Sequence, residues 1–374
     1  MSVANATQPS RVKLLLVASL ALFVVVEIVI LSPSTLDEPS TWGFRPTLNP
    51  QDAITHLGVN DETLAPGIPK GKIPDYTLKD FSYAANQGVQ KMWRLQAKNA
   101  VMFQKEQLVH SRQVMAHLYN AGDEPTIVTG KEAKYFSNQR DLEVFGDVTT
   151  VFPDGFTLYS QYILYHPDTR KIEIPPNQPV RGEGISDEEK TLSFTSEGMD
   201  FSMEKNHIVL PKHVRLKMKR NVPRTANTQG VADDTTIEAD RCEIDRIART
   251  ADFSMDRRRP IAERFVKTRQ EKLLVYSRTG QLNYGEFSTQ LNYMKAFDDV
   301  LIYDTSVRDR KNSEGAKYAT CGQADFDTRK NIIILRKFPQ VYQNSDTVTG
   351  ETILIHKETD IVEVDHSNAY SEGR

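Results

Sequence analysis

The sequence predicts an all-β fold, an elongated antiparallel structure made of repeated units and preceded by one transmembrane helix. Three observations support this prediction. A short pattern of apolar and small residues recurs eight times along the chain. Polar turns separate apolar runs at hairpin spacing, and one apolar segment lies near the amino terminus. Internal repeats with a period of roughly thirty to forty residues indicate stacked units rather than one compact core.

Each copy of the pattern reads apolar, any, small, any, any, apolar or small, any, apolar. The copies begin at Leu95, Val128, Leu158, Phe194, Ile237, Val275, Ala319 and Val348. Their small residues are Ala97, Gly130, Ser160, Ser196, Ala239, Ser277, Cys321 and Gly350, and their last apolar residues are Met102, Tyr135, Tyr165, Phe201, Ile244, Leu282, Phe326 and Ile355. Residues two apart face the same side of a strand, but the next matching position lies three further on. The strand must therefore bulge or bend near the small residue if both halves are to face inward.

Second apolar runs follow polar turns, which predicts two strands in each unit. Residues 172–174 follow the polar turn 167–171, and residues 332–335 follow the polar turn 327–331. Turns of this composition between apolar runs are typical of β-hairpins. The same residues could fill the core of an ordinary sandwich, but eight units of one kind favour an elongated stack.

Residues 12–31 are predicted to form a transmembrane helix, with residues 1–11 in the cytoplasm and residues 32–75 as a linker. The apolar run from Leu14 to Leu31 has the length of a short membrane span. Arg11 and Lys13 precede it, so the positive-inside rule places the rest of the chain across the membrane. A cleaved signal peptide is the competing interpretation, although residues 30–34 lack a small-residue cleavage site.

Composition and motifs argue against nucleic-acid binding and against catalysis. The net charge is −3, and the basic runs at 213–220 and 257–259 fit either protected edge strands or the binding of anionic headgroups. The chain contains no phosphate-binding loop, dinucleotide fingerprint, nucleophile elbow or zinc-ligand spacing. We therefore expect no enzyme activity, no catalytic residue, no cofactor and no metal. Cys242 and Cys321 are expected to be two buried thiols, with a disulfide as the alternative.

Several motifs occur in the order in which one known family has them. They are Leu-Lys-Asp-Phe-Ser-Tyr at 78–83, Trp-Arg-Leu-Gln-Ala at 93–97, Glu-Pro-Thr-Ile-Val-Thr-Gly at 124–130 and Leu-Glu-Val-Phe-Gly-Asp at 142–147. With these motifs, residues 12–220 resemble the lipopolysaccharide-export family LptC. Residues 322–327 and 348–353 resemble the related OstA or LptA-like modules.

The resemblance implies a partly open β-jellyroll, also called a β-taco, on an inner-membrane anchor in a Gram-negative cell. An LptC-like jellyroll would span residues 76–222, and a second OstA/LptA-like jellyroll would span residues 223–374. The bulk of the chain would lie in the periplasm. It would receive lipopolysaccharide from the subunits of an inner-membrane ABC transporter and pass it to a periplasmic bridge protein of the LptA kind.

The repeated apolar positions are then expected to line a groove for lipid acyl chains. The expected lining residues are Leu95, Met102, Val128, Tyr135, Leu158, Tyr165, Phe194, Phe201, Ile237, Ile244, Val348 and Ile355. We expect the strand at 78–83 to meet the transporter and the strands at 353–364 to meet the bridge protein by strand addition. The alternative is a periplasmic structural or docking β-repeat protein whose core is filled and holds no lipid.

Overall fold

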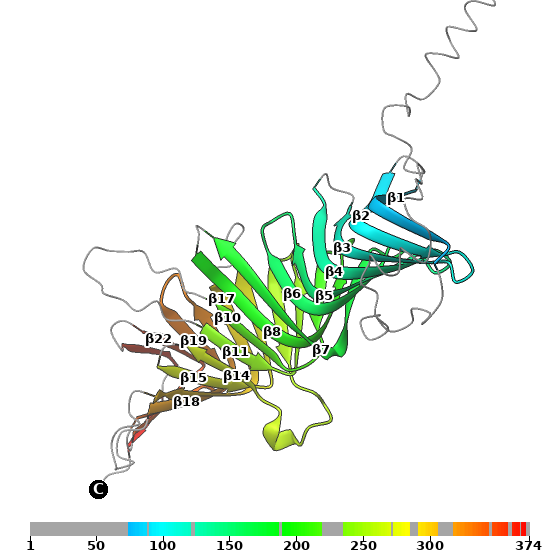
Figure 1. Ribbon diagram of the computed structural model, residues 1–374. Coiled ribbons are helices and arrows are strands. Elements are labelled where there is room, and N and C mark those ends of the chain that lie inside the picture. Colours follow the sequence, from blue (N-terminus) through cyan, green and yellow to red (C-terminus); the bar gives the residue numbers. More distant parts are fainter. Residues whose placement is uncertain are drawn as a thin grey trace, which may run out of the picture. The chain divides into compact units, whose positions relative to one another are not determined.

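The computed structural model describes residues 74–87, 90–120, 124–186, 189–218, 235–270, 272–284, 291–305, 317–343, 346–357, 361–366 and 368–371. All of them belong to one compact unit, Thr47–Arg374. The described strands form a single antiparallel sheet, in which they follow one another from β1 toward the C-terminus (Figure 1). The all-β antiparallel prediction is therefore confirmed.

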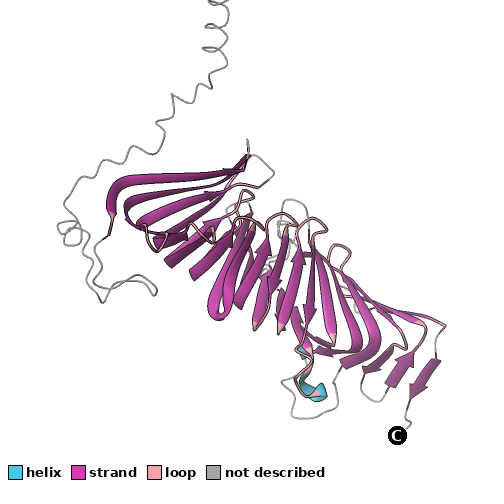
Figure 2. Ribbon diagram, turned by 90° about the vertical axis from the view of Figure 1, so that its right-hand side faces the viewer, coloured by secondary structure: helices cyan, strands magenta, loops and turns pink. Residues whose placement is uncertain are grey.

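The first eight strands form a continuous meander in which each strand pairs with the next. They are β1 (Tyr76–Gln87), β2 (Gln90–Phe103), β3 (Leu108–Leu118), β4 (Thr126–Phe136), β5 (Asp141–Val151), β6 (Thr157–His166), β7 (Lys171–Ser186) and β8 (Glu189–Ser202). Figure 2 shows these long strands side by side and curved along their length. Their apolar and polar residues alternate, as in β6, where every second residue in the first half is buried.

Beyond β8 the sheet divides into two walls, which we call wall A and wall B. The second half of β8 pairs with the first strand of wall A, and its first half pairs with the first strand of wall B. Wall A continues through β9 (His207–Leu210), β12 (Arg241–Asp245), β13 (Thr250–Ser254) and β16 (Thr279–Tyr284). Wall B continues through β10 (Val214–Met218), β11 (Thr235–Ala239), β14 (Val266–Gln270) and β15 (Leu273–Ser277).

Two long strands, β17 (Leu291–Asp304) and β18 (Lys317–Asp327), again cross from one wall to the other. Wall A then ends with β19 (Ile332–Arg336), β22 (Thr352–His356) and β23 (Val362–Asp365). Wall B ends with β20 (Gln340–Gln343), β21 (Asp346–Thr349) and β24 (Asn368–Ser371). The strands on either side of the expected module boundary at 222/223 are paired, β10 with β11 and β9 with β12, so the sheet is continuous there.

The two walls meet at a corner where each long strand bends. The pairing register slips at this corner, for example between Phe145 and Val148 of β5 and between Phe297 and Val300 of β17. Gly146 and Asp147 have positive φ angles of 80° and 48°, the left-handed conformation that a bulge uses. The small residues of the pattern lie beside these slips, so the bend that the spacing predicts is found. Gly130 has no room for a side chain, since an added Cβ would lie 2.5 Å from Val144 Cγ1.

A larger excursion leaves the corner between β13 and β14 and carries the basic run 257–259. It contains the short 3-10 helix η2 (Ile261–Glu263), which stands out from the sheet in Figure 2. Arg259 holds its base by donating two hydrogen bonds, of 2.6 and 2.7 Å, to the Asp240 carboxylate. The predicted transmembrane helix at 12–31 and the tail at 1–11 lie outside the described residues, as does nearly all of the linker. Within the described ranges, no helix is long and apolar enough to cross a membrane.

Candidate functional site

The inner face of the sheet carries two unbroken rows of paired residues, one on each wall. The row on wall B contains every residue at which the repeated pattern begins. In pairing order it runs Tyr83, Leu95, Ala116, Val128, Thr150, Leu158, Gly182, Phe194, Leu216, Ile237, Thr268, Val275, Ile302, Ala319, Val341 and Val348. Each unit therefore contributes two successive residues to this row, and its first position returns to the same line on the sheet.

The row on wall A contains every residue with which the pattern ends. It runs Met102, Val109, Tyr135, Leu142, Tyr165, Ile172, Phe201, Ile208, Ile244, Ala251, Leu282, Met294, Phe326, Ile333 and Ile355. The corner turns the two rows toward each other. The repeated positions thus line the interior from the second strand of the sheet to the last strands described.

Of the twelve residues expected to line a groove, nine are buried and three are partly exposed. The buried ones are Leu95, Val128, Tyr135, Leu158, Tyr165, Phe194, Phe201, Ile237 and Ile244. Met102, Val348 and Ile355 are partly exposed. Each of these three lies in the strand next to an edge strand of the sheet, so only one further strand covers it on that side.

The two cysteines are free and buried, and burial raises the pKa of the Cys321 thiol to about 11.

Aromatic side chains fill the interior at two places. Near the first strands, Tyr83 and Trp93 of wall B contact Tyr135 of wall A, with ring centroids 5.1 and 4.9 Å from the Tyr135 ring. The Tyr83 and Tyr135 hydroxyls are 3.3 Å apart. Burial, followed by this hydrogen bond, raises the pKa of Tyr135. The walls therefore touch in this region, and the interior is closed.

The second aromatic cluster lies beside β8 and joins both rows. Phe152 packs edge-on against Phe201 of wall A at 5.1 Å, and Phe156 stacks on Phe194 of wall B at 5.9 Å. Gly182 makes room for this stack. The pattern does not include Phe152 and Phe156, because they flank the turn between β5 and β6. The sequence Phe-Pro-Asp-Gly-Phe at 152–156 nevertheless indicates a tight turn that brings two apolar residues together.

A cavity of about 80 Å³ remains between the walls beyond this cluster. Its apolar lining includes Phe194 and Leu216 from wall B and Ile244 and Leu282 from wall A. For comparison, an engineered cavity of about 150 Å³ holds one benzene ring. The cavity at this place is therefore too small to hold an acyl chain unless the walls move apart there.

The side of the interior opposite the corner, which we call the mouth, is bridged by side chains. The bridging pairs are Tyr83–Tyr135, Met92–Arg170, Asn120–Met203 and Asp154–Arg246. The partners of the last three pairs are 78, 83 and 92 residues apart, so each pair joins the mouth edge of wall B to a turn of wall A much further along the chain. A residue pattern within successive strands cannot predict such pairs, because the twist of the sheet determines which residues of the two walls meet.

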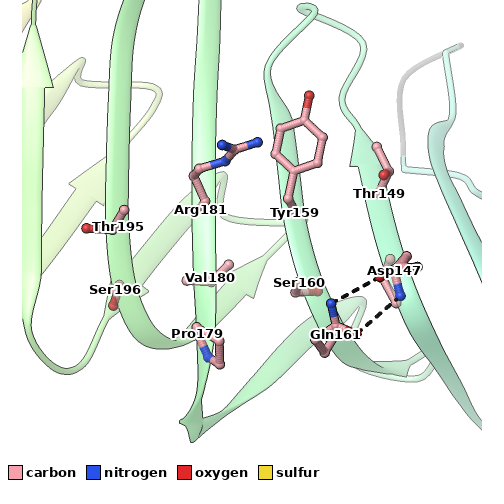
Figure 3. Close-up of a pocket in the computed structure, with 11 residues that line it drawn as sticks. Asp147, Thr149, Tyr159, Ser160, Gln161, Pro179, Val180, Arg181, Thr195 and Ser196 are labelled. Atoms are coloured by element: carbon pink, nitrogen blue, oxygen red, sulfur yellow. Dashed lines mark hydrogen bonds between the residues drawn. The ribbon is translucent and has the colours of Figure 1, made fainter.

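A separate hollow of about 380 Å³ lies on the outer face of wall B near the corner (Figure 3). The Arg181 guanidinium lies 4.7 Å from the centre of the Tyr159 ring, and Gln161 hydrogen-bonds Asp147 at 3.2 Å. Tyr159 follows Leu158 directly in the strand, so its side chain points away from the interior. This hollow is therefore separate from the interior rows.

The described residues contain one group with spacing suited to a metal, Glu351, Asp365 and His366, and all three are exposed. The other described histidines include His110, whose ring lies 2.7 Å from the Glu132 carboxylate. Burial, the largest single influence, opposes ionisation of Glu132, but the hydrogen bond with His110 and the nearby positive charges together outweigh it and lower the pKa of Glu132. These pairs lie outside the interior rows.

Comparison with known proteins finds a family resemblance for residues 56–219. The family model described as "Lipopolysaccharide-assembly, LptC-related" matches residues 56–219. These residues are therefore similar to the LptC-related family. The resemblance that the motifs indicate is thus confirmed, although the match begins later than residue 12. No curated protein matches the chain.

Among solved structures, the chain is similar to LptH, the LptA-homologous periplasmic component of the lipopolysaccharide transport device from Pseudomonas aeruginosa. The identity is 14%, the TM-score is 0.31, and the match covers 37% of this chain and 95% of LptH. The LptC-related region holds eight of the twelve expected lining residues, from Leu95 to Phe201. Ile237, Ile244, Val348 and Ile355 lie beyond it, where the LptA-like module stays a prediction.

Proposed function

We propose that this protein is an inner-membrane-anchored periplasmic component of lipopolysaccharide export that takes up lipid acyl chains between its two walls. The observation that carries the proposal is the pair of continuous apolar rows on the inner face of an LptC-related sheet. Acyl chains need an apolar path, and each buried methylene contributes roughly 0.8 kcal/mol. The rows continue past residue 219, so one path would serve the whole sheet. No step in this function requires catalysis.

The interior must open for this function, because the aromatic clusters fill it in the structure described. The walls are joined along the corner by the backbone, whereas at the mouth they are joined by side chains. Side-chain bridges of this kind are individually weak. Opening at the mouth would expose both rows without breaking strand pairing. A hinge at the corner is consistent with the register slips found there.

The two ends of the sheet are suited to partner strands. Among the described strands, β1 pairs only with β2, β23 only with β22, and β24 only with β21. Unpaired edges can accept a strand from a neighbour through backbone hydrogen bonds. We propose that β1 meets the ABC transporter, and that β23 and β24 meet a bridge protein of the LptA kind. The strands expected at 353–364 are β22, which is paired on both sides, and most of β23, which lies at the edge.

The membrane anchor at residues 12–31 belongs to the same proposal and rests on the apolar run and its flanking charges. It would hold the sheet on the periplasmic side of the inner membrane. Its direct test is accessibility of an introduced cysteine at Ser2 or Ser34 to a membrane-impermeant reagent. Labelling at residue 34 and not at residue 2 in intact spheroplasts is expected.

Photo-crosslinking in cells tests the lipid path. A photoreactive amino acid placed at Leu158 or Phe194, which face the interior, should form adducts with lipopolysaccharide. The matched controls are Tyr159 and Thr195, which follow directly in the same strands and face outward. Adducts at the inner positions alone support the path.

The filled interior favours one alternative, a docking protein whose repeats form a solid core. This alternative predicts no lipid adduct at any inner position while protein partners still crosslink at β1 or β24. Equal labelling of inner and outer positions would also contradict the proposed path, because it would indicate lipid contact from the outside only.

A further inference from the structure

One ion pair at the mouth, between Asp154 and Arg246, lines the cavity. Asp154 lies in the turn between β5 and β6, at the mouth edge of wall B, and Arg246 follows β12, at the mouth edge of wall A. The two side chains form an ion pair across the mouth, and both line the 80 Å³ cavity together with Phe194 and Leu282. The pair therefore separates an apolar interior from solvent.

Arg246 is less exposed and more firmly packed than Asp154. Its side chain is 21% exposed and its guanidinium lies 5.4 Å from the centre of the Phe152 ring, whereas the Asp154 side chain is 52% exposed. The Arg246 backbone N–H also donates to the Asn206 carbonyl at 3.0 Å. An ion pair with so exposed a carboxylate is weak. Displacing Asp154 is thus easier than displacing Arg246.

We propose that Arg246 binds a phosphate of the glycolipid headgroup while the acyl chains occupy the interior, and that the Asp154 carboxylate pairs with Arg246 when no lipid is bound. This inference rests on the proposed function. A guanidinium presents a planar fork of donors that fits a carboxylate and a phosphate alike. A phosphate monoester carries about −1.5 to −2 charges at neutral pH, against −1 for a carboxylate. Phosphate is therefore the stronger partner, and its arrival would release the bridge across the mouth.

The position of Arg246 suits this role for a second reason. It lies at the boundary where an acyl chain leaves the apolar rows and a polar headgroup enters water. Arginine is well suited to such a boundary, since its apolar stem packs on the cavity while its charged end reaches solvent. Arg246 lies outside the LptC-related residues 56–219, so this site would belong to the second half of the chain.

The experiment measures binding of two probes to the purified full chain in detergent, by displacement of a fluorescent fatty acid. One probe is a bis-phosphorylated acylated glucosamine disaccharide, and the other is its phosphate-free counterpart. Arg246→Gln should reduce the preference for the phosphorylated probe about tenfold, as expected for loss of a charge-assisted hydrogen bond. Arg246→Lys should keep most of the preference, and Asp154→Asn should strengthen binding of the phosphorylated probe.

Arg241→Gln is the matched control, because Arg241 begins β12, the strand that Arg246 follows, and forms an exposed ion pair with Glu243, outside the interior. It should leave the preference unchanged. Unchanged fatty-acid binding by the Arg246 variants shows that they fold. A preference that survives Arg246→Gln overturns this inference and leaves the proposed function standing. Failure of the wild-type chain to bind the fatty acid overturns both the lipid path and this site.

Discussion

Replacement of Gly182 by alanine should destabilise the protein more than a methyl group added at any other position of the inner rows. Gly182 lies between Leu158 and Phe194 in the wall B row and is buried. A Cβ built at this position would lie 2.3 and 2.6 Å from two carbons of the Phe194 ring and 2.7 Å from Phe156. Because Phe156 and Phe194 stack on each other, neither ring can turn away without losing that contact.

The expected cost follows from these distances. Ring carbons at 2.3 Å must move by about 1 Å or more to reach ordinary contact, and overpacking of this kind typically costs about 1–3 kcal/mol. Gly280 provides the matched control, because it lies on the same face of β16 as Leu282 of the wall A row, but an added Cβ there would meet Val266 at an ordinary 3.6 Å. Gly280→Ala should therefore stabilise the fold by about 0.4–1 kcal/mol, by restricting the unfolded chain.

The assay is urea unfolding of the full chain in detergent, followed by the fluorescence of buried Trp93. Gly182→Ala should lower the midpoint and Gly280→Ala should raise it, with similar dependence on urea concentration. Equal midpoints for the two variants would refute the reasoning, because they would show that the Phe156 and Phe194 rings do not occupy the space above Gly182.

Three further predictions concern groups outside that cluster. Burial, the largest single influence, opposes ionisation of Asp240, but the hydrogen bond from Arg259, the Asp256 backbone N–H and the charge of Arg259 together outweigh it and lower its pKa; this stabilisation is complete above the unfolded pKa of about 3.9 and is lost as pH falls through the lower folded value. Arg259→Gln should weaken this acid dependence of the urea midpoint below about pH 4, and an unchanged dependence would contradict it. Cys242 and Cys321 should resist maleimide at pH 7.5 until urea unfolds the chain, because both are buried and burial raises the pKa of both thiols; rapid labelling of the folded chain would be the contrary result. Tyr165→Phe should leave stability unchanged or raise it, since the buried Tyr165 hydroxyl has no hydrogen-bond partner among the described residues, and a loss of about 1 kcal/mol or more would show that a partner exists.

The repeated pattern predicts the sheet well because strand geometry fixes where its residues point. Leu95 and Phe194 are 99 residues apart, yet they lie in one row because each unit contributes two antiparallel strands. The small residues predict the corner for a similar reason, since crowding there excludes side chains, as at Gly130. Local spacing therefore suffices to predict the inner face, the bend and the antiparallel order.

Contacts between the walls could not be predicted in the same way. Phe152 and Phe156 fill the interior from a turn, where strand alternation no longer applies. Asp154 and Arg246 meet because twist offsets the two walls, which no spacing within one unit records.

The distance between the walls tests the central claim most directly. Spin labels at Arg215 of β10 and Glu243 of β12, which face outward from wall B and wall A, report this distance without entering the interior. With Cys242 and Cys321 changed to alanine, the distance in the full chain is measured by pulsed electron resonance with and without acylated glycolipid. A shift to longer distances by about the width of one acyl chain is expected when the lipid binds. Bound lipid with an unchanged distance would contradict the account.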